Sequence, residues 1–185
     1  MSQDKVRLET AHAHSTVYST AGPFTDIEFR LPSGRWVHPM ATALWGEVLD
    51  PSIPGRLCRL GGEFFCLPFG GGGTVRDSVS GWESLTTAPV NEPMHGPAAN
   101  ADWQIVAHDR NSVRMAIDLP EEYTVIRIER QISLSADRPF ACSTVPLEIR
   151  RDGSVPVAFH PILRLPCWRT LLRGRAVRSA ARTFS

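Results

Sequence analysis

The chain has 185 residues, which is enough for one domain with a sizeable core or for part of a larger one. Its formal net charge of +1 excludes a global field that would attract nucleic acid or an anionic membrane, and no apolar run is long enough to span a bilayer. The first residues carry charges of both signs and lack the apolar segment of a secretory signal, so we expect a cytoplasmic protein with reduced cysteines.

Short alternating runs between Val6 and Val37, broken by turns, predict strands rather than helices. His12 and His14 would share a face of one such strand, and an HxH pair can bind a metal. No acidic or histidine partner follows at a recognisable spacing, so a solvated strand face is the favoured interpretation. We expect no metal.

An apolar run from Gly61 to Gly73 lies between glycine clusters and predicts a buried strand that leads into a mobile loop. No Lys-Ser or Lys-Thr pair follows, which argues against a nucleotide-binding loop, and no cofactor is expected. Upstream, residues 41–49 fit either a short helix or a loop with a helical turn.

The segment from Trp82 to Trp103 is rich in Pro, Asn and Gly and predicts a long loop. His95 followed by Gly96 lets the backbone pass close to a ligand while the imidazole points at it. Trp103 offers a flat apolar surface of the kind on which sugar rings stack. The alternative is a loop packed by its tryptophan, with a histidine that takes no part in binding.

After Trp103 the alternation of apolar and polar residues becomes strong. Residues 104–108 predict a strand and residues 109–111 a turn. The apolar sets that follow are Val113, Met115, Ile117, Leu119; Ile126, Ile128, Ile132, Leu134; and Val145, Leu147, Ile149. Successive strands joined by turns predict an antiparallel meander in a β-sandwich, which leaves one polar face free for binding.

The stretch from Val155 to Pro166 also alternates like a strand. Its apolar face, predicted to be buried, comprises Val157, Phe159, Leu163 and Leu165. The other face presents His160 and Arg164, a pairing that suits an anionic or polyhydroxylated ligand. The alternative is a histidine at a strand end that does no chemistry.

Residues 167–185 contain five arginines and no acidic residue. A basic tail can bind phosphate-rich partners, but a shift of reading frame gives the same jump in composition, and we favour that interpretation. We therefore expect one domain over residues 1–166 and an atypical Arg-rich tail over residues 167–185.

Taken together, several stretches resemble the aldose 1-epimerase, or galactose mutarotase-like, superfamily. They are Gly62 to Gly70, His95-Gly96 with Trp103 downstream, Val125 to Pro139, and His160-Pro161 followed by Leu163 and Leu165. The resemblance covers roughly residues 20 to 166. It implies an all-β antiparallel β-supersandwich, of which this chain is the N-terminal portion, incomplete at the C-terminus.

The resemblance also implies roles for single residues. The histidine of the HG pattern helps to bind the sugar and that of the HP strand acts as general acid, which implies these roles for His95 and His160. An arginine after the Pro-Phe strand often contacts sugar hydroxyls, and Arg76 is the candidate. The superfamily's base is a glutamate near the C-terminus, whereas no acidic residue follows Pro166 here.

Three interpretations of the function follow. The first is an enzyme that interconverts the α and β anomers of a hexose by acid/base ring opening. The second is a non-catalytic carbohydrate-binding module that uses His95, Trp103 and His160. The third is an inactive truncated fragment, which could form a homo-oligomer to cover its strand edges. The expected partner is a monosaccharide or related sugar, with no nucleic acid and no membrane.

Overall fold

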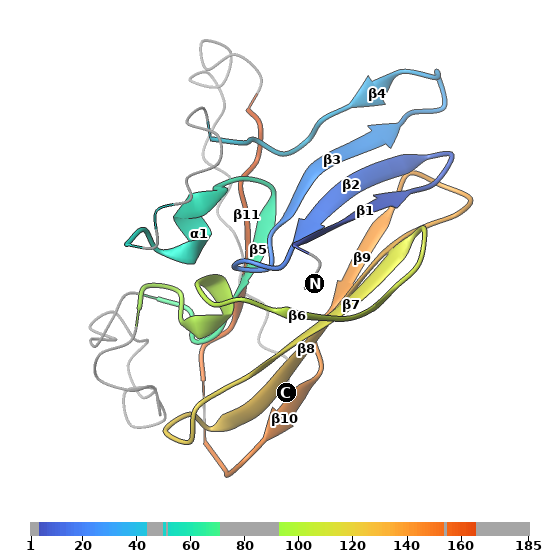
Figure 1. Ribbon diagram of the computed structural model, residues 1–185. Helices are drawn as coiled ribbons and strands as arrows, with labels where there is room; N and C mark the ends of the chain where they lie inside the picture. The colour runs from blue at the N-terminus through green and yellow to red at the C-terminus, as the bar shows by residue number, and fades with distance from the viewer. Residues whose placement is uncertain (1–3, 44–49, 51, 71–92, 154, 166–185) are drawn as a thin grey trace, which may run out of the picture.

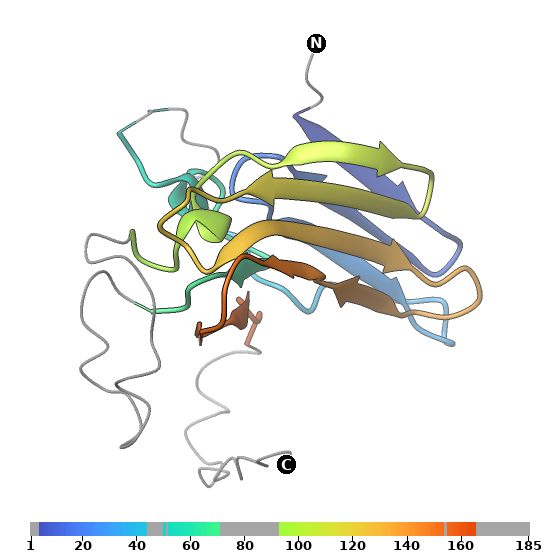
Figure 2. The same ribbon diagram turned by 90° about the horizontal axis from the view of Figure 1, so that it is seen from below.

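The computed structural model describes residues 4–43, 50, 52–70, 93–153 and 155–165. Within these ranges the chain folds into two antiparallel sheets that pack face to face (Figures 1 and 2). The predicted all-β fold class is therefore confirmed. None of the described helices is long and apolar enough to cross a membrane.

The first sheet has the strand order β1-β2-β3-β5-β11, and β4 pairs with β3. Its strands are β1 (Lys5–Glu9), β2 (Ala13–Tyr18), β3 (Phe24–Arg30), β4 (Trp36–Val37), β5 (Glu63–Cys66) and β11 (Ala158–Pro161). The strand β11 returns to pair with β5, which sets Phe159 opposite Phe65 and His160 opposite Phe64. This long-range pairing positions the candidate site.

The second sheet has the order β10-β8-β7-β6, and β9 also pairs with β8. Its strands are β6 (Gln104–His108), β7 (Ser112–Asp118), β8 (Val125–Leu134), β9 (Ala141–Thr144) and β10 (Leu147–Ile149). The prediction of one strand through Val145, Leu147 and Ile149 is wrong, because Pro146 separates β9 from β10 and cannot donate a ladder hydrogen bond.

The two sheets close on each other where β1 contacts β7 and β8, and we call this the closed side. Alternating side chains from both sheets fill it, as the sequence predicts. Leu8, Val17, Met115, Ile128 and Ile132 are all fully buried. Each such side chain stabilises the fold by roughly 1.5–3 kcal/mol.

On the other side of the sandwich, formed by β9, β10 and β11, the described residues do not bring the two sheets together, and we call it the open side. A hollow of about 300 Å³ lies there between the sheets. Its walls include Phe24 and Ile27 of the first sheet, Ser143 of the second, and Phe159 of β11. Large apolar side chains stay exposed on these strands or close to their ends, namely Phe140, Ile149, Val157, Phe159, Leu163 and Leu165.

The prediction that the apolar face of residues 155–166 is buried is therefore wrong. Phe159 does turn toward the space between the sheets, since its ring centroid lies 5.3 Å from that of Phe65. It remains 48% exposed because the hollow, rather than a facing strand, lies beside it. Leu165 is 65% exposed.

Several expectations fall on parts of the chain that the structure does not describe. Residues 44–49, 71–92 and 166–185 lie outside the described ranges, and with them the choice of helix or loop after Ala41, the glycine-rich loop and the tail. The buried strand predicted after Gly61 is confirmed as β5. Two short helices were not predicted, α1 (Gly55–Cys58) and η2 (Pro97–Ala99).

Candidate functional site

Two histidines from distant parts of the chain meet on the outer face of the first sheet. The ring centroids of His95 and His160 lie 5.2 Å apart, with the rings inclined edge to face at 61°. Both side chains are half-buried. The structure therefore brings together the two imidazoles that the sequence singles out.

His160 is held by β11. Its register partner on β5 is Phe64, and the two rings stack with centroids 4.7 Å apart and planes 8° from parallel. Phe64 is 2% exposed and packs with Cys66 and Ala99 in a small apolar cluster on this face. A rigid strand and a fixed aromatic ring thus set the orientation of the imidazole.

His95 is held by a tight turn rather than by a strand. Its φ is 68° and that of Gly96 is 71°, so two successive residues are left-handed. A Cβ at Gly96 would lie 2.1 Å from the carbonyl oxygen of Leu67, which only glycine can avoid. The imidazole of His95 stacks on Phe69, with centroids 5.4 Å apart.

An arginine and an asparagine clamp this turn, and the sequence does not reveal them. The Asn100 amide donates to the carbonyl oxygens of Met94 at 2.9 Å and Gly96 at 2.7 Å. Arg56 of α1 donates to the side-chain oxygen of Asn100 at 2.6 Å. These contacts join segments 44 residues apart, which no local pattern signals.

Trp103 has a different role from the predicted one. Its side chain is 2% exposed, so neither face of the indole is open to a sugar ring. Its Nε1 donates to the carbonyl oxygen of Ala98 at 2.9 Å, inside η2. We therefore assign Trp103 to holding the turn that follows His95, and leave it out of the binding surface.

The two arginines of the predicted site do not join the histidine pair in the described structure. Arg76 lies outside the described residues. Arg164 is exposed and lines another hollow, with His14, Glu28 and His38. Its backbone N–H donates to Pro39 at 2.8 Å. Of the predicted residues, the structure thus places only His95 and His160 side by side.

The electrostatics of the pair suit proton exchange with a ligand. Burial lowers the pKa of His95, and the positive charges of His160 and Arg56 lower it further, so this imidazole is neutral near pH 7. The Nδ1 atoms of both His95 and His160 are buried without a hydrogen-bond partner. A buried nitrogen without a hydrogen-bond partner is unfavourable for the folded state. These two atoms therefore indicate a place where a ligand or a water molecule can supply the missing hydrogen bond.

Comparisons with known proteins rest on structure alone. No protein-family model matches the sequence, and no curated protein matches it either. A galactose mutarotase-like protein from Lactobacillus casei superposes with a TM-score of 0.56 at 10% identity, over 88% of this chain and 50% of that chain.

Two further solved structures agree. A galactose mutarotase related enzyme from Lactobacillus acidophilus superposes with a TM-score of 0.55 at 14% identity, over 89% of this chain and 50% of that one. A proposed aldose 1-epimerase from Escherichia coli K12 gives 0.54 at 15% identity, over 85% and 50% of the two chains. The fold is galactose mutarotase-like. The chain spans about half the length of these solved structures.

Behind the histidine pair, the mutarotase-like sandwich contains a buried ion pair that sequence reasoning missed. Arg130 is fully buried and donates to the Glu63 carboxylate, to Gly22 at 2.9 Å and to Ser143 at 3.1 Å. Burial raises the pKa of Glu63, and the charge of Arg130 opposes that rise. A signal existed, because Arg130 interrupts the apolar face formed by Ile128 and Ile132.

Among the residues that the structure describes, the site thus presents two imidazoles and no carboxylate beside them. Glu63 forms its ion pair with Arg130 between the sheets, and it lies on the opposite face of β5 from Phe64. In the part of the chain that the structure describes, neither His95 nor His160 forms an ion pair with an acidic residue. The arrangement can bind a hydroxylated ring and move a proton at one side of it.

Proposed function

We propose that the chain binds a monosaccharide at the histidine pair and takes part in interconverting its α and β anomers. The observation that carries the proposal is the convergence of two imidazoles, each with a buried, unpartnered Nδ1, from a turn and from a strand. The mutarotase-like fold supports it as analogy only.

In this proposal His160 is the general acid that protonates the ring oxygen of the sugar as the ring opens. An imidazole can both give and take a proton near neutral pH, which suits that step. His95, neutral because its pKa is lowered, accepts a hydrogen bond from a sugar hydroxyl. Arg76 remains proposed as a contact to sugar hydroxyls.

Ring opening also needs a base for the proton of the anomeric hydroxyl. None of the described carboxylates touches either imidazole, so the base must come from elsewhere. This observation favours a second candidate function, in which the same pair binds sugar without catalysis. An inert fragment is the third.

Polarimetry on fresh α-D-glucose and α-D-galactose tests the catalytic proposal. We expect rotation to decay faster with the protein than in buffer, and His160→Gln to reduce the protein-dependent rate about 100-fold or more. His108→Gln, on an exposed strand of the other sheet, is the matched control and should leave the rate unchanged. Decay no faster than in buffer overturns catalysis by this chain.

A titration separates the binder from the inert fragment. We expect saturable shifts of the His95 and His160 ring resonances on addition of D-galactose, lost in His160→Gln. Saturable shifts without accelerated rotation would establish the binding module. Absence of both would leave the fragment interpretation.

A further inference from the structure

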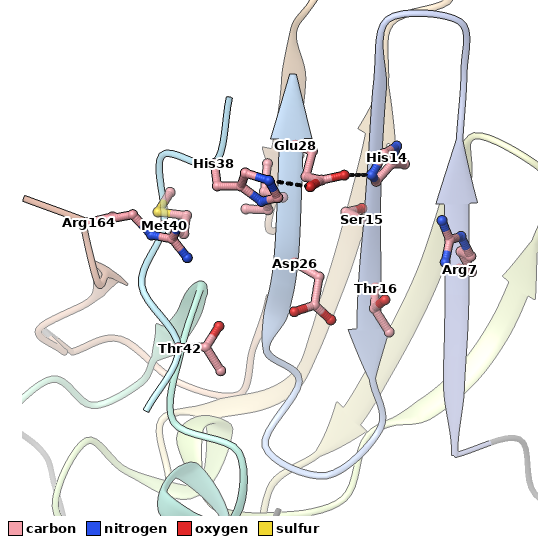
Figure 3. A pocket seen from close by; sticks show the side chains of 11 residues that line it. Arg7, His14, Ser15, Thr16, Asp26, Glu28, His38, Met40, Thr42 and Arg164 are labelled. Atoms are coloured by element: carbon pink, nitrogen blue, oxygen red, sulfur yellow. Dashed lines mark ion pairs between the residues drawn. The ribbon is translucent and has the colours of Figure 1, made fainter. Parts of the chain in front are cut away.

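Another hollow, of about 330 Å³ and with mainly polar walls, lies on the outer face of the first sheet (Figure 3). Its lining comes from β1, β2, β3, the segment 38–42 and the residue Arg164 beyond β11. The charged and titratable side chains in it are Arg7, His14, Asp26, Glu28, His38 and Arg164. Neither His95 nor His160 lines it, so it is separate from the histidine pair.

Glu28 is fixed at the centre of this hollow by two histidines. His14 contacts one carboxylate oxygen of Glu28, and His38 contacts the other at 2.5 Å, as the dashed lines in Figure 3 show. Trp36 packs against His14 with ring centroids 4.6 Å apart. Since each carboxylate oxygen has more than one acceptor direction, Glu28 can still accept hydrogen bonds from a ligand.

The strand pairing directs a second carboxylate into the same space. Opposite the single residue Ser15 of β2, β3 places both Asp26 and Ile27, which is a β-bulge. Asp26 takes the extra position, with a left-handed φ of 49°, and its exposed side chain lines the hollow. Bulges change the direction of side chains and are frequent beside functional sites. A left-handed backbone conformation is unfavourable for a residue other than glycine, so the surrounding structure must hold Asp26 in it.

A buried hydroxyl lies behind the wall of the hollow without a hydrogen-bond partner. Ser15 is 2% exposed and lines the hollow, and its Oγ forms no hydrogen bond. Leaving a buried hydroxyl unsatisfied is unfavourable. Ser15 shares the inward face of β2 with Ala13 and Val17, so this hydroxyl lies behind the hollow, and the polar surface of the hollow comes from the outward side chains of the strands.

The charges select the ligand class. Leaving the histidines aside, two carboxylates balance the guanidinium groups of Arg7 and Arg164, neither of which has an ion-pair partner within the described ranges. An anion would meet both carboxylates, and a cation both arginines. The described residues contain no group of three metal-ligating side chains. A hydroxyl, in contrast, can donate to carboxylate and accept from guanidinium at once.

We propose that this hollow binds a small, neutral polyhydroxylated molecule, a cyclic polyol or a saccharide unit, independently of the histidine pair. Asp26 and Glu28 accept hydrogen bonds from its hydroxyls, and Arg7 and Arg164 donate to them. The volume lies at the small end of ligand pockets, which run from about 300 to 1,000 Å³.

The probe is myo-inositol, which has no anomeric centre and so cannot report ring opening. We titrate it into the full, ¹⁵N-labelled chain and follow the amides of Ser15, Asp26 and Glu28 and the indole N–H of Trp36. Saturable shifts at these positions are expected. Asp26→Asn, Glu28→Gln and Arg7→Gln should each weaken binding about tenfold or more while preserving the dispersion of the spectrum.

Two controls set the limits. Glu129→Gln makes the same charge change on the second sheet, where Glu129 contacts Arg127 at 3.4 Å, and should bind inositol as the natural chain does. His160→Ala should also leave inositol binding intact. The proposal is overturned if inositol gives no saturable shift, if only inorganic phosphate or Zn²⁺ shifts these amides, if Glu129→Gln weakens binding equally, or if His160→Ala abolishes it.

Discussion

The closed and open sides of the sandwich are built from the same kinds of residue and differ in what faces them. On the closed side, β1 lies against β7 and β8, and Leu8 and Ile128 are fully buried. On the open side, Phe159, which lines the hollow, and Ile149 of β10 are both about half exposed. Apolar alternation in a sequence therefore specifies which way a side chain points, and a neighbouring layer decides whether it is buried.

The largest effect should come from the ion pair under the open side. Arg130→Met removes the cation from a buried carboxylate and should lower the free energy of unfolding by about 3–5 kcal/mol, measured by urea denaturation. The double variant with Glu63→Gln should recover part of the loss, because the uncompensated charge is gone. Equal stability of the single variant and the natural chain would show that water already reaches this pair.

Two isoleucines of the second sheet compare the sides directly. Ile128→Ala, at a fully buried residue of β8, should cost about 2–5 kcal/mol because it leaves a cavity in packed surroundings. Ile149→Ala, at a residue 53% exposed, should cost about 1 kcal/mol or less. Similar losses at both sites in urea denaturation would mean that the open side is covered in solution.

Phe159 tests what the exposed edge does to association. Phe159→Ser should cost about 1 kcal/mol, since half of the ring is already in water, and should reduce self-association seen by sedimentation velocity. Val106→Ser, at a residue 40% exposed on β6, is the control and should leave association unchanged. A monomeric natural chain would remove the expectation of a homo-oligomer.

The smallest effect should be a pH dependence at His95. Burial lowers the pKa of His95 in the folded chain. In the unfolded chain the same imidazole takes up a proton near pH 6.5, so protonation favours the unfolded state. The free energy of unfolding should therefore fall as the pH drops below about 6.5, and His95→Gln should make that decline shallower. Identical pH slopes for the two proteins between pH 7.5 and 5.5 would contradict the burial of this imidazole.

Much of the fold could be predicted from sequence because its strands alternate locally. The strands around Val113 and Ile132, the turn at Asp109 and the buried strand at Phe64 are where the pattern predicts them. The break at Pro146 was missed because Val145 and Leu147 keep the same period on either side of it.

The site was predictable where a residue pair carries a local constraint, and not where the constraint is distant. His95 next to Gly96 signals a special turn, and the structure requires that glycine. The clamp between Arg56 and Asn100 depends on a contact between separate segments. For Trp103 the structure shows the alternative, a tryptophan that packs its loop, in place of the predicted binding surface, because nothing in the sequence distinguishes an exposed indole in a loop from one packed beneath it.

The bulge in β3 has a consequence for length variation. Removing Asp26 would make the pairing of β2 with β3 uniform, because Thr16–Thr25 and His14–Glu28 would then fall in one continuous register. Ile27 would still point inward and Glu28 outward. Deletion of this one residue should therefore disturb the strand pairing less than deletion of a paired residue of β3. Deleting Phe29 instead would disturb its pairing with Ala13 and Val37. Asp26 is thus dispensable to the ladder that carries it.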